Sequence, residues 1–188
     1  PMKRIALLVA LALAVPSVAC TAETDAPDVA AEDDLTAKSD SAAEAAITKT
    51  TKDVYFLSES DHALVWVKSA KKLDGYLTAS DVKAQFAAVT DGDAMADKPL
   101  AGLSGETVAF ETFAGRYKPV AGEDADNFAY HQQMTKVLSA VRNNLKNPKV
   151  IRLGRKSGNN LVGAISVYIV GTLPSGKIGG IFTVSVET

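Results

Sequence analysis

The sequence is poor in the residues from which disulfides, thiol catalysis and zinc sites are built. Of its 188 residues, 1 is cysteine and 2 are histidine. The single cysteine, Cys20, excludes a disulfide within the chain and disfavours a catalytic thiol. His62 and His131 lie far apart in sequence, and His131 has no carboxylate at a spacing typical of metal ligands. We therefore expect a protein that is not an enzyme, with no cofactor and no metal of its own.

Two stretches resemble catalytic motifs but fail at a decisive position. Residues 171–177, GTLPSGK, fit the start of a phosphate-binding P-loop. However, Ile178 stands where Ser or Thr should hold magnesium, and the next segment is predicted as a strand, not a helix. Residues 102–105, GLSG, are one residue short of a nucleophile elbow, and nothing nearby supplies a base. We reject both motifs.

The chain begins with a predicted lipoprotein signal. Lys3 and Arg4 precede an apolar run over residues 5–15, which is too short to span a bilayer and typical of a secretory signal. The run ends in PSVAC, which is similar to a bacterial lipobox. Residues 1–19 are therefore predicted as a signal peptide that is cleaved before an acylated Cys20.

Lipidation predicts the location of the protein. Thr21, not aspartate, follows Cys20, which favours an exported protein anchored at the periplasmic face of the outer membrane in a Gram-negative host. The acyl chains would attach it stably to the cell envelope. The alternative is ordinary cleavage after Ala19 or Ala22 with an unmodified cysteine.

Negative charge is concentrated in a predicted tether over residues 20–40. Residues 21–39 carry 6 acidic side chains and 1 lysine, have no apolar period and cannot bury enough surface to fold. Residues 40–188 carry 17 basic and 16 acidic side chains, and 17 minus 16 gives a net charge of +1. The acidity belongs to the tether, whereas the domain at 41–188 is almost neutral.

A basic run without an intervening acid lies near the end of the chain. It comprises Arg142, Lys146, Lys149, Arg152, Arg155 and Lys156. Such a run could bind phosphates or anionic lipid head groups, and the alternative is a solvated helix end and loop. Because the domain is nearly neutral and aromatics are not interleaved, direct nucleic-acid binding is not favoured, and we expect membrane contact through the lipid anchor only.

Local patterns predict helices interspersed with strands. We expect helices over 41–51, from 78 and over 124–144, and strands over 54–57, 63–67, 108–113, 165–169 and 182–186, with loops over 90–105 and 155–162. Turn chemistry at 173–177 joins the last two strands, in which apolar residues alternate with polar ones to give one apolar face each. The prediction is a single-domain α+β sandwich, a mainly antiparallel sheet packed by helices and ending in a β-hairpin.

Helix boundaries carry recognisable signals. Asp40 or Ser41 is the expected cap of the first helix, and Thr78 with Asp81 resembles a capping box. The long helix has an apolar stripe made by Met134, Leu138, Val141 and Leu145. Residues 147–148, Asn-Pro, are expected to stop it.

Two oxygen-rich positions stand at the ends of buried segments. Glu59 lies in the polar turn 58–61, between two apolar runs, although spacing alone makes a solvated surface carboxylate the simpler interpretation. Thr188 lies within two residues of an apolar strand position. We therefore expect its carboxylate to be held in a defined place, unlike most chain ends.

Several short matches in the right order resemble the nuclease A inhibitor family, whose members block a non-specific DNA/RNA endonuclease. They are FLSES at 56–60, NLKNP at 144–148, RLG at 152–154 and VET at 186–188. The resemblance extends from about residue 42 to the end. None of these matches is a catalytic fingerprint.

The resemblance implies a plug mechanism. The family's target holds magnesium in a cleft, and a plug must offer oxygen ligands there. Glu59 matches the family's loop glutamate that enters the cleft, and Thr188 matches the terminal threonine that reaches the metal region. Ser58 and Ser60 could bind the nuclease or stiffen the loop, and Glu187 is a further candidate.

The chain departs from the family pattern at one interface position. Where the pattern has a tryptophan before the long helix, residues 119–123 are PVAGE. Aromatic anchors often carry much of an interface. We therefore expect an inhibitor of a magnesium-dependent non-specific nuclease, with an alternative: an envelope-anchored binding module of the same fold that recognises another protein or ligand.

Overall fold

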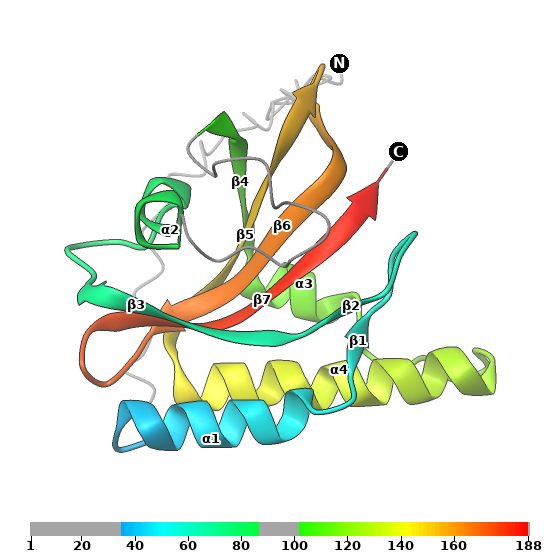
Figure 1. Cartoon of the computed structure of the whole chain (residues 1–188). Helices are drawn as coiled ribbons and strands as arrows, with labels where there is room; N and C mark the ends of the chain where they lie inside the picture. Colours follow the sequence, from blue (N-terminus) through cyan, green and yellow to red (C-terminus); the bar gives the residue numbers. More distant parts are fainter. Residues whose placement is uncertain (1–34, 87–101, 188) are drawn as a thin grey trace, which may run out of the picture. The chain divides into compact units, whose positions relative to one another are not determined.

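The computed structural model describes residues 35–86 and 102–187 (Figure 1). The predicted signal peptide, Cys20, residues 20–34 of the tether and Thr188 lie outside the described residues. In chain order the elements are α1 (Asp40–Thr51), β1 (Tyr55–Phe56), β2 (His62–Ala63), β3 (Val65–Lys72), α2 (Ala79–Gln85), β4 (Ser104–Ala109), α3 (Phe110–Gly115), α4 (Ala125–Asn144), β5 (Lys146–Ser157), β6 (Asn160–Thr172) and β7 (Lys177–Glu187). No helix among these residues is long and apolar enough to cross a membrane.

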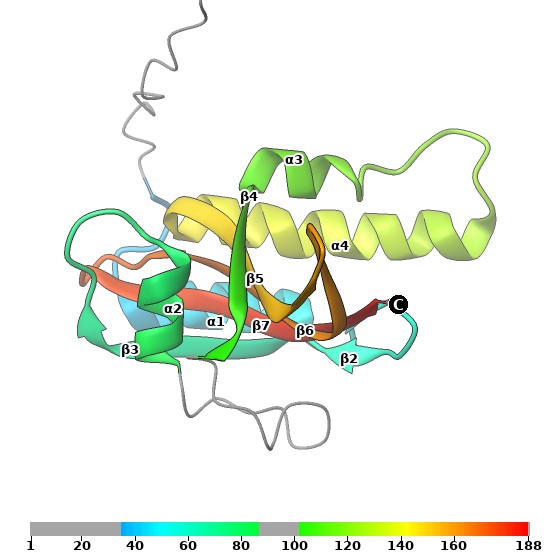
Figure 2. The same ribbon diagram turned by 90° about the horizontal axis from the view of Figure 1, so that it is seen from above.

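The predicted α+β sandwich is confirmed. Five strands form an antiparallel sheet in the order β3-β7-β6-β5-β4, and β1 and β2 form a separate small hairpin. Helices α1 and α4 lie side by side beneath the sheet, whereas α2 packs on its other face (Figures 1 and 2). Strands β6 and β7 form the predicted hairpin, which lies inside the sheet between β3 and β5.

Both faces of the central strands are buried, which differs from the prediction of one apolar face each. Ile165, Val167 and Ile169 of β6 face α1 and α4, but Ser166 and Tyr168 are also buried, against the α2 side. The cause is the second helical layer: α2 covers the face on which the sequence places polar or amphipathic residues. The sheet is therefore the middle layer of three.

Helix α4 follows the sequence closely. Asp124 caps it, and its Oδ1 accepts hydrogen bonds from the N–H groups of Asp126 (3.1 Å) and Asn127 (3.0 Å). These bonds, that of Asn127 foremost, hold the pKa of Asp124 below its usual value. The predicted stripe is buried against the sheet: Met134, Leu138, Val141 and Leu145, joined by Val137.

The helix ends at Asn144, as predicted, but the Asn-Pro pair at 147–148 is not what stops it. Residues 147–148 lie inside β5. Leu145 already has extended backbone and is buried, so the chain turns directly from helix into strand. Pro148 sits in the irregular stretch of β5 between the pairs Lys146↔Thr172 and Lys149↔Val170, where a missing N–H is tolerated.

Three further predictions are corrected. Residues 108–113 are not one strand: β4 ends at Ala109, and α3 begins at Phe110, because Phe110 and Phe113 are both buried at helical spacing. The predicted loop over 90–105 overlaps the start of β4, although its residues up to 101 lie outside the described ones. The predicted loop over 155–162 is instead the end of the β5–β6 hairpin, in which Arg155 pairs with Val162.

The start of α1 is also corrected. Ser39 is its cap, and the Ser39 Oγ accepts the N–H of Ala42 at 3.2 Å. Asp40 instead accepts from the N–H (3.1 Å) and the hydroxyl (2.8 Å) of Ser175, in the β6–β7 turn. The predicted capping box of Thr78 and Asp81 at the start of α2 is confirmed.

Candidate functional site

The predicted inhibitory loop lies beside the end of β7. The Oγ of Ser58, in the turn between β1 and β2, accepts the backbone N–H of Val186 at 3.2 Å. The same hydroxyl donates to the carbonyl of Ser60 at 2.7 Å. The N–H of Leu57 donates to the Tyr130 hydroxyl of α4 at 3.2 Å. The loop base is thus attached both to the last strand and to the long helix.

Glu59 lies at the exposed tip of this turn, as the sequence predicted. Ser60 Oγ lies 3.0 Å from the Nε2 of His62, the first residue of β2. These contacts hold the turn on both sides of Glu59. The carboxylate is therefore presented from a short, internally bonded turn rather than from a long loop.

Glu187, the last described residue, is held by an arginine. Its carboxylate pairs with the Nη2 of Arg152 in β5 and lies 3.2 Å from the Oγ of Ser185. The Nη1 of Arg152 pairs with Glu106 of β4 at 3.1 Å. One guanidinium therefore joins the end of β7 to the edge strand at the other side of the sheet.

An open hollow of about 280 Å³ lies between these groups. Its lining residues come from the end of β1 and the turn after it, from α3 and the segment after it, from the middle of β5 and β6, and from the end of β7: Phe56, Leu57, Ser58, Phe113, Arg116, Tyr117, Arg152, Val167, Ser185, Val186 and Glu187. Aromatic and aliphatic side chains line it together with two arginines and the Glu187 carboxylate. Burial raises the pKa of the Tyr117 hydroxyl well above its ordinary value, so the phenol stays protonated even in alkaline solution.

The structure brings most of the predicted site residues together. Ser58 and Glu187 line the same hollow, and Glu59 and Ser60 lie in the turn beside it. Thr188, the remaining one, follows Glu187 but lies outside the described residues. Two segments that are about 128 residues apart in sequence thus form one surface.

Sequence reasoning assigned no site role to Arg152, Tyr117 or Arg116. Arg152 did carry a signal, because it is a polar residue between the buried Ile151 and Leu153 of β5. A charged side chain in such a position needs a partner on its own face of the sheet. Arg116 and Tyr117 follow α3, which the sequence did not predict, and their location could not be inferred.

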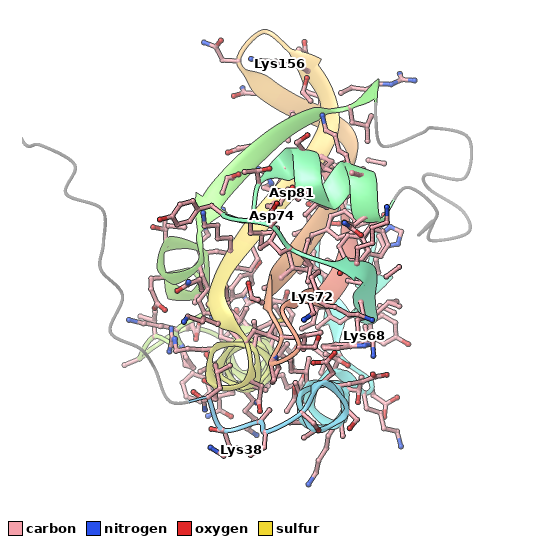
Figure 3. All side chains as sticks on the ribbon, turned by 90° about the vertical axis from the view of Figure 1, so that its left-hand side faces the viewer. Lys38, Lys68, Lys72, Asp74, Asp81 and Lys156 are labelled. Carbon is pink, nitrogen blue, oxygen red and sulfur yellow. The ribbon has the colours of Figure 1, made fainter. Side chains whose placement is uncertain are left out.

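The basic run is dispersed over the described surface. Arg142 pairs with Glu111, Arg152 is taken up by its two glutamates, and Lys149 donates to the carbonyl of Leu77. Lys156 lies at the tip of the β5–β6 hairpin, far from the lysines of β3 (Figure 3). These residues do not form one phosphate-binding stripe. Within residues 35–86 and 102–187 there is also no cluster of three or more metal-ligating side chains.

The fold and site define a small α+β domain that presents a rigid turn and a strand end, as a binding module does. A family model for the nuclease A inhibitor-like protein matches residues 41–188. The chain belongs to the nuclease A inhibitor-like family. No curated protein matches it.

Proposed function

We propose that this protein inhibits a magnesium-dependent, non-specific DNA/RNA endonuclease by occupying its active-site cleft. The turn that carries Glu59 and the chain end at Thr188 are the parts that enter. The domain performs no chemistry. It competes with the nucleic-acid substrate for the metal-containing cleft.

One observation carries this proposal: the hydrogen bond from the Val186 N–H to the Ser58 Oγ. It ties the turn of Glu59 to the strand that leads to Thr188. Two oxygen donors intended for one metal site must lie on the same surface, and this bond joins the segments that hold them. Because the turn and the described part of β7 are bonded to each other, little conformational entropy is lost when they bind.

The chemistry suits a hard metal ion. Magnesium prefers oxygen ligands and binds through one or two carboxylates together with water or phosphate oxygens. The Glu59 carboxylate supplies such oxygens at an exposed turn. The hydroxyl of Thr188 supplies another. The domain would thus replace the phosphate of the substrate.

Attachment to the cell envelope is part of the proposal. Acylation of Cys20 and export to the periplasmic face of the outer membrane would place the inhibitor where a secreted or imported nuclease passes. Radiolabelled palmitate incorporation into the wild-type precursor, lost in Cys20→Ser, tests this step independently of inhibition.

The test of the mechanism compares variants in a plasmid-cleavage assay. We expect Glu59→Ala, or deletion of Thr188, to weaken inhibition by about thirty-fold or more, as for a residue central to an interface. Asp74→Ala is the matched control, since Asp74 is an exposed carboxylate after β3, outside the proposed surface (Figure 3). Equal loss in Asp74→Ala and Glu59→Ala would contradict the plug mechanism.

The absence of an interface tryptophan at residues 119–123 favours a second function. The only tryptophan in the chain is Trp66, and residues 119–123 offer none. A domain of this fold that has lost nuclease recognition would bind another envelope protein or ligand instead. In that case wild-type protein would not inhibit, and deletion of Thr188 would have no effect on binding to the other partner.

A further inference from the structure

Arg152 of β5 forms ion pairs with β4 on one side and, past β6, with β7 on the other. In the register of β4 and β5 it lies directly opposite Glu106, and in that of β5 and β6 it lies opposite Val167. Strand β7 lies beyond β6, yet the Arg152 guanidinium reaches Glu187 at its end. The side chain therefore crosses the face of β6 to connect two strands that are not neighbours.

Both terminal nitrogens of the Arg152 guanidinium form ion pairs. Nη1 pairs with Glu106 and Nη2 with Glu187, while the Arg152 side chain is only 17% exposed. Charge-assisted hydrogen bonds in partly buried settings are stronger than those on an open surface. Removing one carboxylate would leave half of a desolvated cation without its partner.

The contact to Glu187 holds the side chain of the last described residue of β7, one residue beyond the bond between Val186 and Ser58. Terminal residues are poorly ordered unless something ties them down. At the end of β7, the register pairs Gly163 with Glu187, and Gly163 has no side chain to pack against it. Within residues 35–86 and 102–187, the side chains that bond to Glu187 are Arg152 and Ser185.

We infer that Arg152 is a positioning residue of the inhibitory surface: by binding Glu187 it fixes the end of β7 in the orientation that the partner binds. This inference rests on the proposed function. It adds a residue of β5, outside the turn and the chain end, to the machinery of inhibition. The Glu106 arm holds the guanidinium but does not itself touch the terminal strand.

The alternative is that Arg152 merely stabilises the sheet. The two glutamates separate these roles, because they pair with the same guanidinium and have similar exposure, 48% for Glu106 and 43% for Glu187. A purely structural bridge would respond similarly to the loss of either arm. A positioning residue would respond locally, at the end of β7, only when the Glu187 arm is lost.

The experiment uses the mature wild-type protein, Arg152→Met, Glu187→Gln and Glu106→Gln. Amide hydrogen exchange at Val186 and Glu187 reports the order of the strand end without any nuclease. We expect Arg152→Met and Glu187→Gln to accelerate exchange there by about tenfold, and Glu106→Gln to change it by about twofold or less. Global unfolding by urea is followed in parallel, and a uniform change in exchange that tracks it would overturn the inference.

Inhibition of the nuclease is the second readout. We expect Arg152→Met and Glu187→Gln to weaken it together, with the double variant no worse than Arg152→Met alone. Glu106→Gln should inhibit nearly as well as wild type. If the exchange pattern appears but inhibition is unchanged, the positioning role is overturned while the plug mechanism stands. If wild-type protein does not inhibit, the proposed function fails, and the positioning role in nuclease inhibition is overturned with it.

Discussion

Tyr168 and Ser166 place two hydroxyl groups in the interior beneath α2. Tyr168 is fully buried between Phe86, 5.5 Å away, and Phe182, 5.0 Å away, measured between ring centroids. Neither hydroxyl has a hydrogen-bond partner among the described residues. Burying an unpaired hydroxyl costs about 1–3 kcal/mol, so the ring of Tyr168 is stabilising while its oxygen is not.

Replacing the oxygen should therefore stabilise the fold. We expect Tyr168→Phe to raise the free energy of unfolding by about 1 kcal/mol, because the ring packing is kept and the unpaired hydroxyl is removed. Urea denaturation followed by circular dichroism measures this. Tyr130→Phe is the control and should be neutral or destabilising, because the Tyr130 hydroxyl accepts the N–H of Leu57.

The same burial predicts a loss of stability at high pH. Burial raises the pKa of Tyr168 above its ordinary value of 10.0. The contribution of Tyr168 to the free energy of unfolding is therefore constant below about pH 10. It falls as the pH rises further, since the phenol ionises more readily in the unfolded chain than in the folded one. Urea midpoints at pH 8 and pH 11 should differ for wild type, and the difference should be smaller for Tyr168→Phe. Equal differences would contradict this assignment.

Among the elements, β7 depends on a backbone position that only glycine fills. Gly180 has a φ of +150°, and a Cβ added there would lie 2.2 Å from the carbonyl oxygen of Ile169 in β6. This is backbone, so no side-chain movement relieves it. Glycine at this position allows β6 and β7 to pair closely in the centre of the sheet.

We expect Gly180→Ala to destabilise the domain by roughly 3 kcal/mol, from backbone strain and a disrupted β6–β7 pairing. Gly115→Ala is the matched control, because nothing lies within 4 Å of the added Cβ at the end of α3. Thermal unfolding of both variants measures the difference. Similar melting temperatures would show that the sheet relaxes around the alanine.

How far the sequence predicts each element depends on whether its signal is local. The capping box of α2, the stripe of α4 and the β6–β7 turn are encoded within a few residues, and all are confirmed. Helix α3 was missed because VAFETF is rich in β-branched and aromatic residues, which favour a strand, and only the packing of Phe110 and Phe113 in the core decides for a helix. The hairpin at 155–162 was missed because residues 155–160, RKSGNN, are all polar or glycine and lack the apolar alternation that indicates a strand.

In the candidate site, too, the features encoded by neighbouring residues were predicted and the long-range contacts were not. The turn around Glu59 follows from local polar residues and is where the sequence placed it. The bond between Ser58 and Val186, and the bridge through Arg152, join residues far apart in the chain. No local pattern could have paired them, and their proximity follows only from the strand order.

At the scale of the whole domain, the start of α1, where the proposed tether joins, and the proposed site lie at opposite ends of β7. Asp40, where α1 begins, is bonded to Ser175 in the turn that precedes β7. The candidate surface lies at the other end of that strand, beside Glu187 (Figure 1). The proposed tether therefore joins the domain at the end of β7 that is away from the proposed inhibitory surface.

This arrangement predicts that anchoring does not impair inhibition. Lipidated protein on vesicles and soluble Cys20→Ser protein should inhibit a free nuclease with affinities within about threefold, since the anchor adds no contact at the interface. A nuclease titration against both forms measures this. Strong inhibition by the soluble form alone would indicate that the membrane covers the site.

The central claim is that the domain occupies a nuclease active site, and one titration tests it most directly. Wild-type mature protein is added to a fixed concentration of a magnesium-dependent non-specific DNA/RNA endonuclease while plasmid cleavage is followed. We predict a linear loss of activity that ends at one inhibitor per nuclease. Undiminished cleavage at tens of micromolar inhibitor, an affinity weaker than about −7 kcal/mol, would contradict the claim and favour a module for another envelope partner.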